Sequence, residues 1–267
     1  MRGSNELPLG SIENVESVSM DRLLEATARA ERDHFWFHGF RRFVHPWLAQ
    51  ATRGLPDPRI LDCGCGTGHN LSMLRQYGRA WGIDLTWSGL AHAHGLGERG
   101  VARASVTDLP FASEQFDLVT SFDVLYALDD TLERKALDEM YRVLRPGGQI
   151  LINVAALKML TGNHSVLGGE VRRYSREELR AHVERTGFVV RRITYTNFLL
   201  LPLVLFVRFA QRLGGHHESD NEITVPSPPV NAILAGTLAL EAHALKRMDM
   251  PAGSSLLALA QKPPRPS

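Results

Sequence analysis

Short apolar runs alternate with amphipathic stretches through the middle of the chain. The strand-like runs are residues 59–63, 79–84, 101–105, 116–123 and 146–156. Helical patterns fill the gaps between them, over residues 70–77, 87–96 and 132–144. Strands that alternate with helices imply right-handed crossovers and a mainly parallel sheet covered on both faces. The pattern therefore predicts a doubly wound α/β fold.

The clearest single helix lies toward the C-terminus, over residues 175–188. Ser175 precedes Glu178 by three positions, which is the spacing of a capping box, and Gly187 marks a helix end. A strand is expected next, over 189–197, and a last strand over 254–262. The two last strands thus complete the predicted sheet, and the helix precedes them.

About 55 residues separate these last two strands. They hold two apolar helix candidates, 198–213 and 230–247, with a polar, proline-rich loop between them. Near the other terminus, aromatic and apolar residues from Met20 to Gln50 predict helices. We expect four segments: an N-terminal helical cap (1–50), a core (51–197), a helical insertion or lid (198–253), and a last strand with a tail (254–267).

Composition adds few constraints. Hydrophobic residues make up 44% of the chain and the net charge is +1, as in ordinary globular proteins, and no single-sign run predicts a nucleic-acid partner. The first 20 residues have no continuous apolar core, so a signal peptide is not expected. The only cysteines, Cys63 and Cys65, lie too close for a structural disulfide, and no further ligands predict a metal site. A cytoplasmic protein is the expectation.

A glycine-rich loop, DCGCGTG, follows the first predicted strand at residues 62–68. In open α/β sheets, ligands bind beyond the carboxyl ends of the strands, and glycines there allow positive φ and close approach. The dinucleotide fingerprint G-x-G-x-x-G fails, because His69 stands where the third glycine belongs. A P-loop lysine is missing as well. The loop is therefore poorly suited to phosphates.

Four stretches together resemble the class I S-adenosylmethionine-dependent methyltransferases. They are ILDCGCGTG (60–68), GIDLTWSGL (82–90), SVTDLPFASEQFDLVTSFDVLYAL (105–128) and VLRPGGQILI (143–152). The resemblance implies a seven-stranded, mainly parallel sheet with an antiparallel last strand, N-terminal helices and a helical insertion before that strand. It also implies S-adenosylmethionine as cofactor and S-adenosylhomocysteine as product.

The cofactor residues follow from this resemblance and from the chemistry of the ligand. S-adenosylmethionine has no phosphate, so its recognition calls for carboxylates. Asp84 would accept hydrogen bonds from the ribose hydroxyls, and Asp62 would lie near the ammonium group. Asp108 would bind the adenine amino group, and the Leu109 amide would complete the adenine edge.

The remaining cofactor contacts come from the loop, from two apolar side chains and from the N-terminal cap. Gly64, Gly66 and Gly68 form the bend, and Leu85 and Phe122 would supply apolar walls. By resemblance, Trp36, Phe37 and Arg41 cover the methionine end, with Arg41 near its carboxylate; a helix that only packs on the sheet edge is the alternative.

Catalytic and acceptor-binding candidates lie in three segments. His164 is the first choice for a base or orienting group, and Tyr126, at the end of the fourth predicted strand, is the second. Arg173 would bind an acceptor carboxylate or phosphate, with Tyr174 beside it, and His38 is an acceptor-binding candidate in the cap. The alternatives are a surface loop for His164, a core or wall position for Tyr126, and local capping for Arg173.

The insertion is expected to set acceptor specificity. Its apolar helices would roof a hydrophobic pocket, or instead dock on a membrane face through 198–213, or form a dimer interface. The pocket predicts a small, partly apolar acceptor, with O-methylation slightly favoured over N- or C-methylation. A nucleic-acid base is not expected, because the fourth motif lacks an Asn/Asp-Pro-Pro-aromatic sequence. A nicotinamide oxidoreductase and a non-catalytic cofactor-binding protein remain the rival interpretations; the protein would be a monomer or homodimer.

Overall fold

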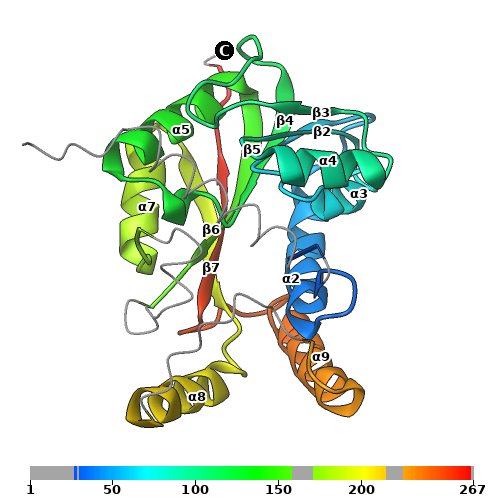
Figure 1. Cartoon of the computed structure of the whole chain (residues 1–267). Coiled ribbons are helices and arrows are strands. Elements are labelled where there is room, and N and C mark those ends of the chain that lie inside the picture. The colour runs from blue at the N-terminus through cyan, green and yellow to red at the C-terminus, as the bar shows by residue number, and fades with distance from the viewer. Residues whose placement is uncertain (1–26, 29, 158–170, 215–224, 266–267) are drawn as a thin grey trace, which may run out of the picture.

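The computed structural model describes residues 27–28, 30–157, 171–214 and 225–265. Its centre is one seven-stranded sheet in the order β3-β2-β1-β4-β5-β7-β6 (Figure 1). The strands are β1 (Arg59–Cys63), β2 (Arg79–Asp84), β3 (Val101–Arg103), β4 (Phe116–Phe122), β5 (Leu144–Ala155), β6 (Val189–Thr196) and β7 (Ser255–Gln261). All the neighbouring pairs among β1 to β5 are parallel, whereas β7 runs antiparallel to both β5 and β6. This confirms the predicted fold class.

Helices cover both faces of the sheet, as Figure 1 shows. On one face lie α5 (Asp130–Val143) and α7 (Arg176–Arg185), and on the other lie α2 (Phe35–Ala51), α3 (His69–Leu74) and α4 (Trp87–Gly95). Alternate residues of the strands pack into two hydrophobic cores, one on each face of the sheet. In β4, Leu118 belongs to the core on the α2 side and Val119 to the core on the α5 side. Two-sided burial explains why the strands read as nearly continuous apolar runs.

Local sequence signals set most of the helix ends. Ser175 and Glu178 form the predicted capping box at the start of α7, with both reciprocal hydrogen bonds present. Gly187 follows that helix at φ 103°, a left-handed conformation that suits glycine. Asp129 accepts hydrogen bonds from two amides at the start of α5, a cap that the sequence analysis missed.

The insertion between β6 and β7 contains α8 (Leu201–Gly214) and α9 (Pro228–Ala244). It leaves and rejoins the sheet at the carboxyl ends of the parallel strands, because Ser255 pairs with both Thr196 and Ala155. The two helices accordingly lie beyond that end of the sheet, at the bottom of Figure 1. Within the described ranges, none of the helices has the length and apolarity needed to cross a membrane.

Candidate cofactor site

The glycine loop bends sharply where β1 ends. Gly64, Gly66 and Gly68 have φ values of 85°, 49° and 83°, which is the left-handed region that the three glycines were expected to occupy. The amides of Gly64 and Cys65 both donate to the carbonyl of Ile83, at 2.8 and 2.9 Å. A Cβ built on Gly64 would lie 2.2 Å from Val124 Cγ2. The loop is therefore fixed to the end of β2, and Val124 leaves no room for a side chain at Gly64.

Asp84 stands at the tip of β2 and organises its surroundings. Its Oδ2 accepts the Gly66 amide at 2.8 Å, and its Oδ1 accepts the amide and hydroxyl of Thr86 at 2.9 and 2.6 Å. A carboxylate has about four lone-pair sites, so acceptor capacity is left for a ligand. Asp84 thus joins the glycine loop to the residue that precedes α4.

Asp62 is the most unusual group of the loop. It is 1% exposed, and its Oδ1 accepts the Thr120 hydroxyl at 2.7 Å. Its Oδ2 is buried without a hydrogen-bond partner among the residues that the structure describes. Burial raises the pKa of Asp62 to about 7, Thr120 opposes that shift through its hydrogen bond, and the negative charge of Asp84 adds to it. A cationic ligand group would satisfy this oxygen, so the residues present fit the ammonium end of the expected cofactor.

The adenine end needs one correction. Asp108 is exposed in the turn after β3, where a ligand has access to it. The Leu109 amide, however, donates to Glu139 Oε2 at 2.8 Å and so is already occupied by α5. Glu139 is in turn paired with Arg142, which holds the pKa of Glu139 below its usual range. The predicted hydrogen bond from Leu109 to adenine is therefore wrong for this conformation, because α5 supplies the acceptor.

The two predicted apolar walls differ in exposure. Leu85 is 57% exposed at the tip of β2, open to a ligand. Phe122 is buried, and its ring meets Phe40 of α2 edge-on at 5.0 Å between centroids. Phe122 therefore supports α2, and it can reach a cofactor only through a small part of its ring.

The N-terminal cap reaches the glycine loop through a residue that the sequence analysis missed. The carboxylate of Glu31, which is 7% exposed, accepts the Thr67 hydroxyl and pairs with His69 Nδ1 at 2.9 Å. Arg41 Nη2 donates to the Glu31 carbonyl at 2.9 Å, so it braces the cap in this conformation. Trp36 and His38 are half-buried on the first turns of α2. Glu31 gave no motif signal, because its partners are 36 and 38 positions away.

The predicted catalytic and acceptor residues are only partly placed. His164 lies outside the described residues. Tyr126 is half-buried, and its carbonyl accepts the amides of Val171 and Arg172 at 2.9 and 3.1 Å, which brings that segment back to the end of β4. Arg173 Nη1 donates to the Ala156 carbonyl at 3.1 Å at the end of β5. Both residues thus lie at the carboxyl edge of the sheet.

Tyr174 is a second correction. It is 2% exposed, and its hydroxyl donates to Glu133 Oε1 at 2.8 Å. Burial beside Glu133 raises the pKa of Tyr174 far above its usual range. The side chain therefore belongs to the core under α5 and α7, and the predicted contact with an acceptor is wrong.

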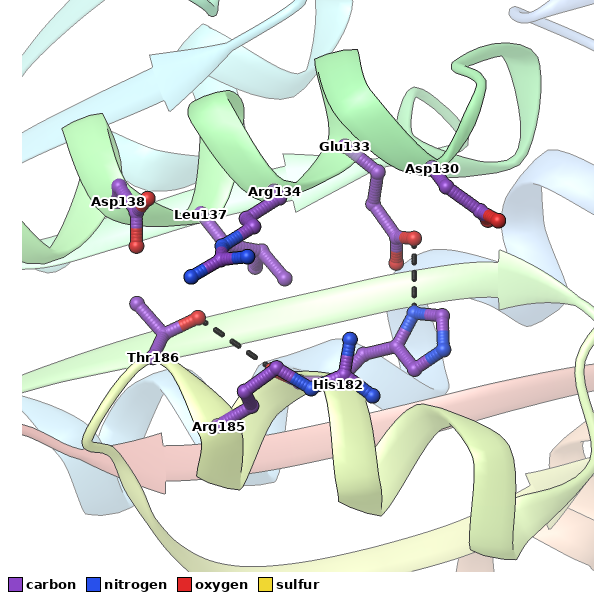
Figure 2. Close-up of a pocket in the computed structure, with 8 residues that line it drawn as sticks. All are labelled: Asp130, Glu133, Arg134, Leu137, Asp138, His182, Arg185 and Thr186. Carbon is purple, nitrogen blue, oxygen red and sulfur yellow. Dashed lines mark hydrogen bonds and ion pairs between the residues drawn. The ribbon is translucent and has the colours of Figure 1, made fainter.

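The same Glu133 borders a charged hollow of about 220 Å³ between α5 and α7, shown in Figure 2. His182 Nδ1 lies 2.8 Å from Glu133 Oε2 inside it. The lining residues are Asp130, Glu133, Arg134, Leu137, Asp138, His182, Arg185 and Thr186. None of them is a predicted site residue, and all belong to the outer helix layer, so this hollow is separate from the glycine loop.

Comparison with known proteins agrees with this geometry. Residues 61–152 match the family model described as a methyltransferase domain. Phthiotriol/phenolphthiotriol dimycocerosates methyltransferase 1 of Mycobacterium ulcerans is 27% identical over 76% of this chain and 74% of its own length. A malonyl-[acyl-carrier protein] O-methyltransferase of Hamiltonella defensa is 30% identical over 55% of this chain and 57% of its own. A solved S-adenosylmethionine-dependent methyltransferase from Archaeoglobus fulgidus superposes with a TM-score of 0.53 at 17% identity, over 84% of this chain and 93% of that one.

Sheet order, loop and acidic strand tips define the class I methyltransferase fold. Together with the family match over residues 61–152, they show that this part of the chain is a methyltransferase domain of the S-adenosylmethionine-dependent kind. The nicotinamide oxidoreductase alternative is thereby set aside. Two further relatives match over only 44% and 49% of their own length, so the chain spans about half the length of several relatives it matches.

Proposed function

We propose that this protein transfers the methyl group of S-adenosylmethionine to a small, partly apolar acceptor, most readily at an oxygen atom. One observation carries the proposal: a buried carboxylate oxygen of Asp62 that lacks a partner among the described residues lies beside a bare glycine bend. A cationic group of the cofactor would satisfy that oxygen. The malonyl-[acyl-carrier protein] enzyme, named as an O-methyltransferase, supports the choice of oxygen.

The chain's own residues would act mainly by holding the reactants. Asp62 would take the ammonium group, and Asp84 the ribose hydroxyls with its remaining lone pairs. Asp108 and Leu85, both exposed at the strand tips, would contact the adenine end. When bound, the cofactor supplies an electrophilic methyl group on a cationic sulfur. Much of the rate enhancement would then come from alignment of the acceptor with that methyl group.

The acceptor would enter at the carboxyl edge of the sheet. Tyr126 and Arg173 lie at that edge, and the insertion with α8 and α9 leaves the sheet there. His164 remains the proposed base or orienting group, and His38 and Trp36 remain proposed contacts from the cap. In this proposal the apolar helices of the insertion would roof this edge, which would suit an acceptor with apolar parts.

Calorimetric titration with S-adenosylhomocysteine tests the cofactor assignment. Asp84→Asn keeps the size of the side chain but loses its charge, and we expect affinity to fall about 10- to 100-fold, as for the loss of ~1.5–3 kcal/mol of charged hydrogen bonding. Asp138→Asn, an exposed change on α5, is the matched control and should bind like the wild type. Equal affinity of Asp84→Asn and the wild type would contradict the proposal.

Release of S-adenosylhomocysteine in the presence of candidate acceptors tests catalysis. A panel of apolar alcohols, phenols and carboxylic acids should give turnover with at least one oxygen acceptor, while matched amines give less. Binding of the cofactor without turnover on any acceptor would favour the non-catalytic alternative. Turnover only with amines would support the assignment as a methyltransferase but would contradict oxygen as the methylated atom.

A further inference from the structure

The residue that directly follows β4 has an unusual backbone conformation. Asp123 has a φ of 60°, in the left-handed region that residues other than glycine seldom adopt. Its amide donates to the Asn153 carbonyl at 3.0 Å, and its Oδ1 accepts the side-chain amide of Asn153 at 2.9 Å. Two hydrogen bonds to one residue of β5 therefore hold both the backbone and the carboxylate of Asp123. Residues held in such conformations cluster at functional sites.

The alternation of side chains along the strands shows which face of the sheet this carboxylate occupies. Ile60 of β1 and Leu151 of β5 both belong to the core on the α2 side. Side chains two positions apart on a strand share a face, so Asp62 and Asn153 also point to the α2 side. Asp123 accepts its hydrogen bond from Asn153, so its carboxylate lies on that side too. Asp62 and Asp123 are therefore held on the same face.

Asp123 also lies where an open α/β sheet binds its ligands. The strand order runs β3-β2-β1 and then β4-β5, so the order reverses between β1 and β4, and the crevice there is the expected ligand site. Asp123 extends β4 at its carboxyl end, beside this crevice. The next residue, Val124, packs so closely on the glycine loop that a Cβ on Gly64 would lie 2.2 Å from its Cγ2. Asp123 is exposed, so a ligand in the crevice has access to it.

The proposed cofactor contacts assign the other parts of the ligand to neighbouring strands. In the proposed function, Asp84 of β2 binds the ribose and Asp62 of β1 binds the ammonium group. The sulfur joins the ribose to the amino-acid chain, so it lies between these two groups along the ligand. The adenosine occupies the β2 and β3 side, so the acceptor must approach the methyl group from the side of β4 and β5. Asp123 stands on that side, at the tip of β4.

We propose that the carboxylate of Asp123 faces the cationic sulfur of S-adenosylmethionine and its transferable methyl group. This inference rests on the proposed function and adds a residue to the same site. Methyl transfer forms a bond between the methyl carbon and the acceptor and breaks the bond between that carbon and the sulfur, which keeps the electron pair. The sulfur of the product is therefore neutral. Asp123 attracts the methyl donor more strongly than the product, which favours exchange of the product for a new donor.

Calorimetric titration with three ligands tests the proposal without an acceptor. S-adenosylmethionine has a positive sulfur, sinefungin has a protonated amine in the corresponding region, and S-adenosylhomocysteine is neutral there. Asp123→Asn removes the charge and keeps the size of the side chain, and asparagine tolerates the left-handed conformation. At pH 7.5 we expect its affinity for the two cationic ligands to fall at least about 5-fold, while its affinity for S-adenosylhomocysteine changes less than about 2-fold.

Two other aspartates provide matched controls with the same substitution. Asp84→Asn should lower the affinity for all three ligands by the same factor, because the ribose is common to them. Asp138→Asn, an exposed change on α5, should leave all three affinities as in the wild type. A change in the ratio of affinities for cationic and neutral ligands therefore reports a charge near the sulfur. Partial unfolding of a variant would lower all three affinities together and would not change this ratio.

The possible outcomes separate this inference from the proposed function. An equal loss of affinity for all three ligands in Asp123→Asn would give Asp123 a structural role only, and unchanged affinities would place it away from the sulfur. A loss for S-adenosylmethionine without a loss for sinefungin would indicate a contact that does not depend on charge. Each of these results overturns the proposal while the cofactor assignment stands. A wild-type protein that binds none of the three ligands would reject the proposed function, and this inference with it.

Discussion

At the scale of single residues, the burial of Asp62 affects both its pKa and its proposed function. One of its oxygens accepts the Thr120 hydroxyl, and the other has no hydrogen-bond partner among the described residues. A buried carboxylate without a cation prefers the neutral form, so its pKa rises from 3.8 to about 7. The proposed contact with the ammonium group of the cofactor would reverse that preference. Cofactor affinity and the ionisation of Asp62 would then be linked.

We expect S-adenosylhomocysteine to bind more weakly as pH falls below about 7, by up to 10-fold per unit, because protons compete with the ammonium group for Asp62. Calorimetry between pH 5.5 and 7.5 measures this slope. The folding stability of the ligand-free protein should change in the opposite direction. Because the pKa of Asp62 is higher in the folded state than in the unfolded state, its contribution to the free energy of unfolding should fall as pH rises from about 4 to about 7.

Asp62→Asn is the control for both slopes, since it cannot ionise. It should flatten the pH dependence of binding and lower affinity at pH 7.5. A slope that persists in Asp62→Asn would assign the titration to another group and contradict this role.

At the scale of elements, the packing of α3 against α4 depends on the last glycine of the loop. Gly68 precedes α3 with φ 83°, and a Cβ there would lie 2.7 Å from the Ala93 Cβ in α4. Gly54 has a similar φ of 79° but nothing within 4 Å of its Cβ position. The two glycines therefore separate backbone strain from crowding.

We expect Gly54→Ala to lower the free energy of unfolding by about 1 kcal/mol, from the left-handed conformation alone. Gly68→Ala should cost about 1–3 kcal/mol more, because Ala93 must move as well. Urea unfolding followed by circular dichroism measures both. Equal losses of unfolding free energy in the two variants would show that α4 accommodates the added methyl group at no cost in stability.

At the scale of the whole molecule, a chain of polar contacts joins three distant segments. Asn231 of the insertion holds the start of α2, and Glu31, just before that helix, holds Thr67 and His69 of the glycine loop. The insertion, the cap and the cofactor loop thus share one set of hydrogen bonds. A substitution in the cap should therefore change the affinity for the cofactor.

Glu31→Ala should weaken S-adenosylhomocysteine binding about 5- to 30-fold, because Thr67 and His69 lose the carboxylate that orients the loop, at a cost of about 1–2 kcal/mol. Asp33→Ala removes an exposed carboxylate two residues away and is the matched control. Titration calorimetry gives the affinities. If both variants bind alike, the cap does not orient the loop.

The local sequence determined most of the secondary structure, and it placed Asp62 and Asp84 near the ends of the first two strands. The strand runs 59–63 and 79–84, the capping box at Ser175 and the left-handed glycines all follow from short-range rules, because neighbouring residues set the dihedrals and the face that each side chain takes. The glycine loop and Asp84 could therefore be found without coordinates.

Tertiary structure decided which polar groups meet. Leu109 is engaged by Glu139, Tyr174 by Glu133, and Thr67 by Glu31, across 30 to 41 positions of sequence. No periodicity encodes such partners, because they depend on how the helices pack on the sheet. The same packing buried an oxygen of Asp62 without a hydrogen-bond partner among the described residues, and it left Phe206 and Phe209 of α8 exposed; the residue types alone did not fix either outcome.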